Sequence, residues 1–176
     1  AVYHELIPQA NAEKPTLGDV VRNSKNKLLG DTNKLNFCLL GDPALTLQYP
    51  QQKIVTDSIN GMIPAQANLP ALGLITIKAS VRDEQNQVDT DFQGTAHITL
   101  YDKAENLQTL SGKGNNPFTY TDYQNKLFSG KVDIIDGQLE FTFMVPKDIN
   151  YSTGPGRIIY YASHEDGIRN AHGYNH

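Results

Sequence analysis

The chain has 176 residues, enough for one ordinary domain or for a small domain with an appended segment. Its 15 basic residues are scattered and its formal net charge is -4, which argues against a nucleic-acid partner. Apolar residues make up 39% of the sequence, and no stretch approaches the roughly 20 apolar residues that a membrane span requires. Nine Tyr, fourteen Gly and nine Pro without any Trp favour an extracellular, turn-rich β module over a helical enzyme.

The first predicted element is a helix that begins after Thr16. Thr16 is a suitable N-cap residue, and Asp19 follows three residues later. Apolar residues then recur at helical spacing as far as Leu28, and Gly30 ends the pattern. These signals predict one helix of about three turns.

Two strands are predicted after this helix. The apolar run 35–40 has the composition of a strand that is buried on both faces. Residues 44–49 alternate between apolar and polar side chains, as an edge strand does. One helix and two strands cannot close a core, so we expect residues 1–50 to be the C-terminal end of an α/β domain that lies mostly upstream.

Gly41, Asp42 and Pro43 separate the two predicted strands and are interpreted as a structural motif. Gly41 permits a sharp bend, the Asp42 carboxylate can accept backbone N–H groups in the turn, and Pro43 fixes φ at the exit. The predicted task of this motif is to connect the first segment to the following β region in a fixed orientation.

Residues 51–176 are predicted to form an immunoglobulin-like β-sandwich, which makes the fold class mainly β. No helical pattern follows residue 50, and β runs alternate with turn signals. The predicted strands cover residues 54–59, 72–81, 95–101, 107–110, 118–123, 127–135, 139–145 and 157–162. The pair Asp136-Gly137 predicts a tight turn, after which alternate residues from Leu139 face the core.

Cys38 is the one cysteine, and histidines elsewhere raise the question of a Cys/His nucleophile. Its neighbours Phe37 and Leu39 lie in the most apolar run of the first segment, so we interpret Cys38 as a buried core residue. We therefore predict no catalytic residue in this chain. A thiol enzyme that uses Cys38 is the hypothesis opposed to this interpretation.

Metal binding is considered at two places. Asp83, Asp89 and Asp91 concentrate oxygen ligands in one loop and are a candidate calcium site, and the alternative interpretation is a solvated turn. His172 and His176 are four residues apart, but the glycines around them argue against a helix, and we expect a frayed terminus there. No other metal or cofactor is predicted.

Tyr120 and Tyr123 are candidates for a binding surface. Together with the flexible loop 111–117 they could recognise a glycan or a protein. The other interpretation is that tyrosines at strand positions cover the rim of the core.

Several strings of the sequence carry a resemblance to a known family. Residues 17–26 read LGDVVRNSKN and residues 36–45 read NFCLLGDPAL, and they resemble the closing helix and strand of the gingipain-type cysteine peptidase domain, an α/β, caspase-like fold. The strings TDSING at 56–61, LYDK at 100–103 and FMVPKDI at 143–149 resemble the sortases of the type IX secretion system in that family.

The resemblance implies a secreted peptidase at the cell surface or outer membrane that removes the sorting signal of exported cargo and joins the cargo to a surface polysaccharide. The catalytic His and Cys of the family would lie upstream, and Cys38 does not match the nucleophile. We expect this chain to be a non-catalytic fragment whose sandwich supports the upstream peptidase domain or presents cargo. An apolar patch left on residues 1–50 would then favour dimerisation. The alternative is a free-standing extracellular module that binds glycan or protein.

Overall fold

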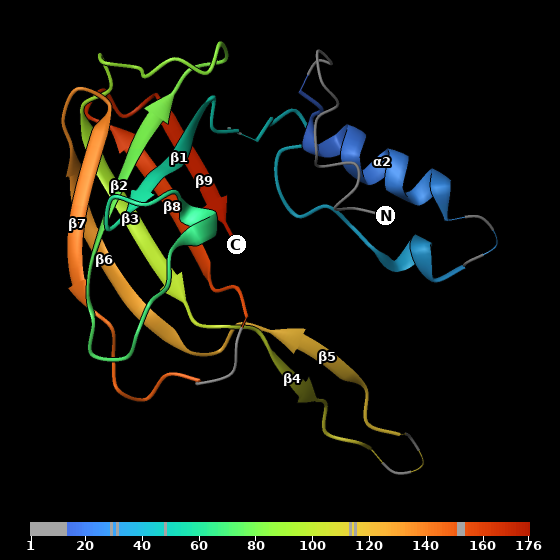
Figure 1. Cartoon of the computed structure of the whole chain (residues 1–176). Helices are drawn as coiled ribbons and strands as arrows, with labels where there is room; N and C mark the ends of the chain where they lie inside the picture. The colour runs from blue at the N-terminus through green and yellow to red at the C-terminus, as the bar shows by residue number, and fades with distance from the viewer. Residues whose placement is uncertain are drawn as a thin grey trace. The chain divides into compact units, whose positions relative to one another are not determined.

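The computed structural model describes residues 14–28, 30, 32–47, 49–112, 114, 116–150 and 154–176. Residues 1–13 of the first predicted segment, and Lys113 and Asn115 of the predicted loop, lie outside this description. The chain forms two compact units, Ala1–Tyr49 and Pro50–His176, which are coloured from blue to red along the chain in Figure 1. That the first unit is the end of an α/β domain stays a prediction.

The predicted helix is confirmed as α2 (Leu17–Lys27). The Thr16 hydroxyl accepts the backbone N–H of Asp19 at 3.1 Å and donates to the Asp19 carboxylate at 2.8 Å, so the N-terminus is capped. Val20 and Ser24 are buried on one face, four residues apart as helical spacing requires. Acidic Asp19 in the first turn and lysines in the last turn also suit the helix dipole.

Both strands predicted in the first unit are wrong. A short 3-10 helix, η1 (Thr32–Asn36), occupies part of the apolar run, and residues 37–40 form no strand. Phe37 and Leu40 are 64% and 95% exposed, and Cys38 is exposed rather than buried. The described residues of 44–49 contribute one isolated bridge, between Thr46 and Thr16. A strand buried on both faces needs neighbouring strands, and the described part of this unit supplies none.

The second unit is a β-sandwich, as predicted, and the fold class is mainly β. Its strands are β1 (Gln52–Ile59), β2 (Leu74–Arg82), β3 (Gly94–Tyr101), β4 (Glu105–Gln108), β5 (Thr119–Asp122), β6 (Lys126–Ile134), β7 (Gln138–Met144), β8 (Arg157–His164) and β9 (Asn170–Asn175). A 3-10 helix, η2 (Pro64–Gln66), lies between β1 and β2. Among the described residues no helix is long and apolar enough to cross a membrane.

Seven strands form one mixed sheet in the order β6-β3-β8-β9-β1-β2-β7. The sheet bends at a short parallel pairing between β1 and β9, where Gln52 pairs with Ala171 and Lys53 with His172. Two layers, β6-β3-β8-β9 and β1-β2-β7, thus enclose one core. Strands β4 and β5 form a separate two-stranded arm, seen at the lower right of Figure 1.

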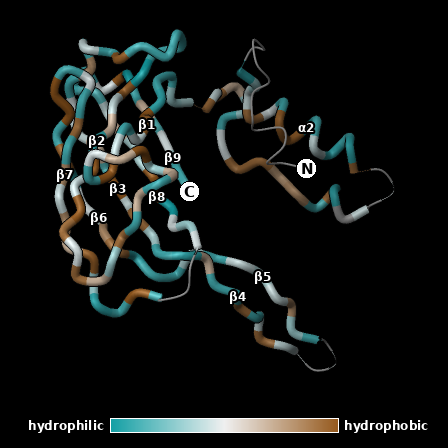
Figure 2. The backbone as a smooth tube through the Cα atoms, viewed as in Figure 1, coloured by the Kyte–Doolittle hydropathy of each residue, from teal (hydrophilic) through white to brown (hydrophobic). Residues whose placement is uncertain are grey.

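Alternating side chains build the core between the layers. Strand β7 buries every second residue, which confirms the alternation predicted from Leu139 onward. Hydrophobic and hydrophilic residues alternate along the sandwich strands in Figure 2. The ring centroid of Phe128 lies 5.0 Å from that of Phe141 and 5.2 Å from that of Phe143. Aromatic rings therefore pack between β6 and β7.

One polar contact crosses this core. The Tyr160 hydroxyl of β8 lies 2.8 Å from the Thr56 hydroxyl of β1, and both residues are buried. Burial raises the pKa of Tyr160, and the hydrogen bond with Thr56 offsets this only in part. The pair therefore satisfies two buried hydroxyls without any partner from solvent.

The predicted turn at Asp136-Gly137 is confirmed. Both residues have positive φ, 51° and 71°, and Ile135 and Gln138 exchange backbone hydrogen bonds of 3.0 and 2.9 Å. The predicted frayed terminus is wrong, because residues 170–175 form β9, which pairs with β8 and β1. Gly173 makes this fit possible, since a Cβ there would collide with the Ile54 carbonyl oxygen.

Candidate functional site

The motif Gly41, Asp42 and Pro43 lies against the start of α2. The Asp42 carboxylate accepts the backbone N–H of Ala44 at 2.9 Å, as the sequence suggested for this turn. The Pro43 carbonyl accepts the N–H of Gly18 at 2.9 Å, and the residue-45 carbonyl accepts the N–H of residue 17 at 2.8 Å. Pro43 of the motif and Leu45 beyond it thus satisfy one N–H group each in the first helical turn. A role in orienting the first unit toward the sandwich stays a prediction.

The three candidate calcium residues do not converge. The Asp83 carboxylate accepts the N–H of Gln87 at 2.8 Å, while the Asp89 carboxylate lies 3.7 Å from the Arg169 guanidinium and accepts the N–H of Asp91 at 3.2 Å. Within the described ranges no group of three or more His, Cys, Asp or Glu side chains is placed to hold a metal ion. Calcium binding at this loop stays a prediction that the arrangement does not support.

The two candidate tyrosines lie in different surroundings. Tyr120 belongs to β5 on the arm and is 40% exposed. Tyr123 lies at the base of the arm, where the Arg157 guanidinium stacks 3.9 Å from its ring centroid and His176 Nδ1 lies 3.3 Å from its hydroxyl. Arg157 thus covers one face of the Tyr123 ring, and a joint binding surface of Tyr120 and Tyr123 stays a prediction.

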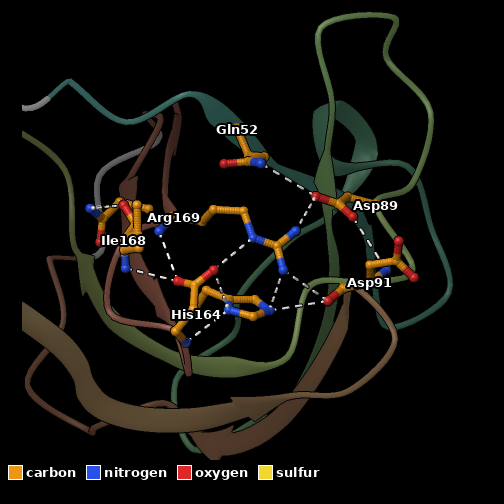
Figure 3. A network of polar contacts seen from close by, with 8 residues as sticks. Gln52, Asp89, Asp91, His164, Ile168 and Arg169 are labelled. Carbon is orange, nitrogen blue, oxygen red and sulfur yellow. Dashed lines mark hydrogen bonds and ion pairs between the residues drawn. The ribbon is translucent and has the colours of Figure 1, made fainter.

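A polar network that the sequence interpretation missed lies at one end of the sandwich (Figure 3). Arg169 Nη2 lies 2.6 Å from His164 Nε2, and His164 Nδ1 faces the Asp166 carboxylate at 3.1 Å. The same Arg169 guanidinium contacts Asp166 at 3.1 Å and the Asp91 carbonyl at 3.4 Å. The turn between β8 and β9 is thereby tied to residues 89–91.

This network resembles a catalytic dyad in residue types only. Its His, Asp and Arg side chains all contact one another. The His164 ring also packs edge-on against the ring of Phe92, with 5.1 Å between the two ring centroids. Gln52 joins from β1 through a 3.4 Å contact with Asp89. The arrangement therefore acts as a clasp that joins three segments far apart in sequence. The one sequence signal was the turn pair Asp166-Gly167.

Acid should loosen this clasp. Hydrogen bonds from the backbone N–H groups of Arg169 and Ile168 hold the pKa of Asp166 well below its ordinary value of 3.8, and the Arg169 side chain adds to this. A lowered pKa in the folded state contributes stability above the ordinary pKa, and that contribution is lost as the pH falls.

We expect Asp166→Asn to lower the free energy of unfolding at pH 7 and to flatten its decline between about pH 5 and pH 3. Urea unfolding at several pH values measures both. The matched control is Asp133→Asn, since the Asp133 side chain makes no hydrogen bond or ion pair within the described residues and the variant should keep the wild-type profile. Parallel profiles for wild type and Asp166→Asn would show that the clasp does not depend on this carboxylate.

Asp102 anchors the opposite end of the sandwich. This buried carboxylate accepts the backbone N–H of Lys103 and the N–H of Asn150, at 2.8 and 2.7 Å, and the Lys103 ammonium at 2.8 Å. Burial alone raises the pKa of Asp102, but these hydrogen bonds outweigh it and the pKa is lowered. Asp102 thus fixes the base of the arm and the loop after β7.

An apolar pocket of about 590 Å³ opens beside Asp102, between the two layers. Its floor is made by Ile77, Leu100 and Ile158 from strands β2, β3 and β8. Tyr101 and His176 are among the residues at its polar wall. The pocket can hold an apolar group, and the Asp102 carboxylate and the Lys103 ammonium in its lining pair with each other at 2.8 Å.

Comparison with known proteins gives one informative match. No protein-family model and no curated protein matches the sequence. The crystal structure of dimeric latent PorU from Porphyromonas gingivalis matches 92% of this chain, with 31% sequence identity and a TM-score of 0.63. The chain spans 16% of the length of that protein. The predicted resemblance is therefore confirmed: this chain is PorU-like over nearly its whole length.

Two further solved structures are much more distant. Spo0M, a sporulation control protein from Bacillus subtilis, shares 13% identity over 72% of this chain and 48% of its own, with a TM-score of 0.36. MtrC from Shewanella baltica shares 12% identity over 70% of this chain and 21% of its own, with a TM-score of 0.35. Neither bears on function.

Proposed function

We propose that this PorU-like chain is a non-catalytic part of a secreted cysteine peptidase or sortase that works at the cell surface or outer membrane. The observation that carries the proposal is the 31% identity to PorU over 92% of this chain, combined with its span of 16% of PorU. The catalytic His and Cys would lie in the remainder of such a protein, as the sequence resemblance implies. Processing of type IX secretion cargo and transfer to a surface polysaccharide would be activities of that whole protein.

The first unit supplies a contact surface for the peptidase domain in this proposal. Leu35 and Phe37 are 71% and 64% exposed, Leu40 is 95% exposed, and Leu45 is 55% exposed. Exposed apolar side chains at this density are typical of surfaces that are covered by another domain. Covering them would also remove the drive toward dimerisation of the chain through this unit.

The sandwich is the supporting element. Its two ends are fixed by the His164 and Arg169 clasp and by the Asp102 anchor, and the strands of its seven-stranded sheet share one continuous core. Such a module holds a neighbouring domain or presents cargo in a defined position without taking part in the chemistry.

A domain exchange tests this proposal. The stretch of Porphyromonas gingivalis PorU that matches this chain is replaced by the chain itself, and cargo maturation and surface attachment are measured in cells that lack their own PorU. We expect the exchange to restore maturation, because both units match that stretch. One control carries an unrelated β-sandwich in the same place, and a second carries the core substitution Ile98→Asp. We expect neither control to restore maturation.

The outcomes separate the interpretations. If the exchanged protein accumulates at the surface but leaves cargo unprocessed, like the unrelated sandwich, the proposed support role is wrong. If the isolated chain cleaves cargo tails by itself, and Cys38→Ser abolishes this cleavage, the chain is a thiol enzyme and the proposal fails.

A further inference from the structure

A row of five side chains crosses the outer face of the sandwich. Register pairs place Lys131 of β6 beside His97 of β3, His97 beside Tyr161 of β8, Tyr161 beside His172 of β9, and His172 beside Lys53 of β1. All five are exposed, and side chains in register on adjacent strands point to the same face. With strands about 4.8 Å apart, the row is roughly 19 Å long.

The middle of this face is apolar. Tyr161 is 48% exposed, and the next row adds Ile159 and Tyr174, which are 39% and 69% exposed. The Tyr161 hydroxyl donates to the Asn170 side chain at 3.2 Å, which fixes the ring on the sheet surface. The face therefore has an aromatic and aliphatic centre with a cation at each end of the row.

The cations of this face lack carboxylate partners. Within the described residues, Lys53, Lys126, Lys131 and Arg157 form no ion pair. Strands β2 and β7 differ: Lys78 of β2 pairs with Glu140 of β7 at 3.3 Å, and Arg82 of β2 pairs with Asp57 of β1 at 2.7 Å. Of the five strands that the row crosses, β6, β3, β8 and β9 together contain a single carboxylate, Asp133, and β1 contains Asp57, which pairs with Arg82.

We propose that this face, defined by the row Lys131, His97, Tyr161, His172 and Lys53, is a docking surface for an acidic protein surface. Protein interfaces combine a central cluster of aromatic residues with a polar rim, and unpaired cations attract an anionic partner. A second copy that bound through this same face would place like charges against each other. The exposed aliphatic side chain of Ile159 suits the apolar contacts of a protein better than an acidic polysaccharide. This inference does not rest on the proposed function.

The test measures binding of the full chain to defined polymers by fluorescence anisotropy. The probes are a random copolymer of Glu and Tyr, poly-L-glutamate, and polygalacturonate. We expect the copolymer to bind most tightly, because it offers both carboxylates and aromatic rings, and to weaken as salt rises from about 50 to 300 mM. The double variant Lys53→Glu with Lys131→Glu should bind about tenfold more weakly. Tyr161→Ala should abolish the preference for the copolymer over poly-L-glutamate.

Matched controls lie elsewhere on the sandwich. Lys78→Glu reverses a charge on the other layer and Tyr120→Ala removes a tyrosine on the arm, so both should bind as wild type does, and the unfolding midpoint of every variant confirms folding. Four results would overturn the proposal: no binding of the copolymer, tighter binding of polygalacturonate, an equal loss in Lys78→Glu, or self-association of the chain in sedimentation that Tyr161→Ala abolishes.

Discussion

Replacing Phe92 by Ala is expected to lower the free energy of unfolding by about 3 to 5 kcal/mol. Phe92 is fully buried. Its ring centroid lies 5.1 Å from that of His164, in an edge-on arrangement, and 5.9 Å from the Arg169 guanidinium carbon. Its carbonyl also accepts the N–H of Gly137 at 3.0 Å, so the residue sits where the clasp, the core and the tight turn meet. Truncation leaves a cavity that the surrounding hydrogen-bonded segments cannot collapse to fill.

Urea unfolding at pH 7 measures this loss. If the slope of the free energy of unfolding against urea concentration is the same as in wild type, the transition stays two-state. Phe118→Ala is the matched control, because Phe118 is 69% exposed next to the arm and should change stability by less than about 0.5 kcal/mol. Equal losses in the two variants would mean that Phe92 does not anchor the sandwich end as described.

Replacing Gly173 by Val is expected to lower the free energy of unfolding by about 3 kcal/mol, at the upper end of the range for overpacking. A Cβ at Gly173 would meet the carbonyl oxygen of Ile54 and also its Cβ, and the backbone of β1 cannot yield as a flexible side chain can. The two strands would have to separate at the pairing that joins the two layers of the sandwich.

Gly112→Val provides the comparison, because a Cβ there meets nothing within 4 Å and the residue needs no positive φ. We expect this control to unfold at the wild-type urea concentration. Hydrogen exchange of the amide of residue 172 should also accelerate in Gly173→Val if the seam opens. If Gly173→Val is as stable as the control, the close approach of β9 to β1 at Gly173 is not as described.

The first unit shows where local sequence signals fail. The capping pair Thr16 and Asp19 acts through contacts three residues apart, so the helix α2 was predictable. The apolar run 35–40 gives a strand only when other strands flank it, and the described part of the unit contains none. Cys38 is exposed for the same reason. The prediction that Cys38 is buried depended on the predicted strand, and both are wrong.

The sequence by itself determined the mainly β class, the turn at Asp136-Gly137 and the alternation of β7, because periodicity and turn chemistry are local properties. It also carried the PorU resemblance. Only the tertiary structure decided the clasp, in which Asp89 and Arg169 meet across 80 residues of chain, and the docking row from Lys53 to Lys131. Strand order and register set these groupings, and they arise from packing of the two layers rather than from any contiguous pattern.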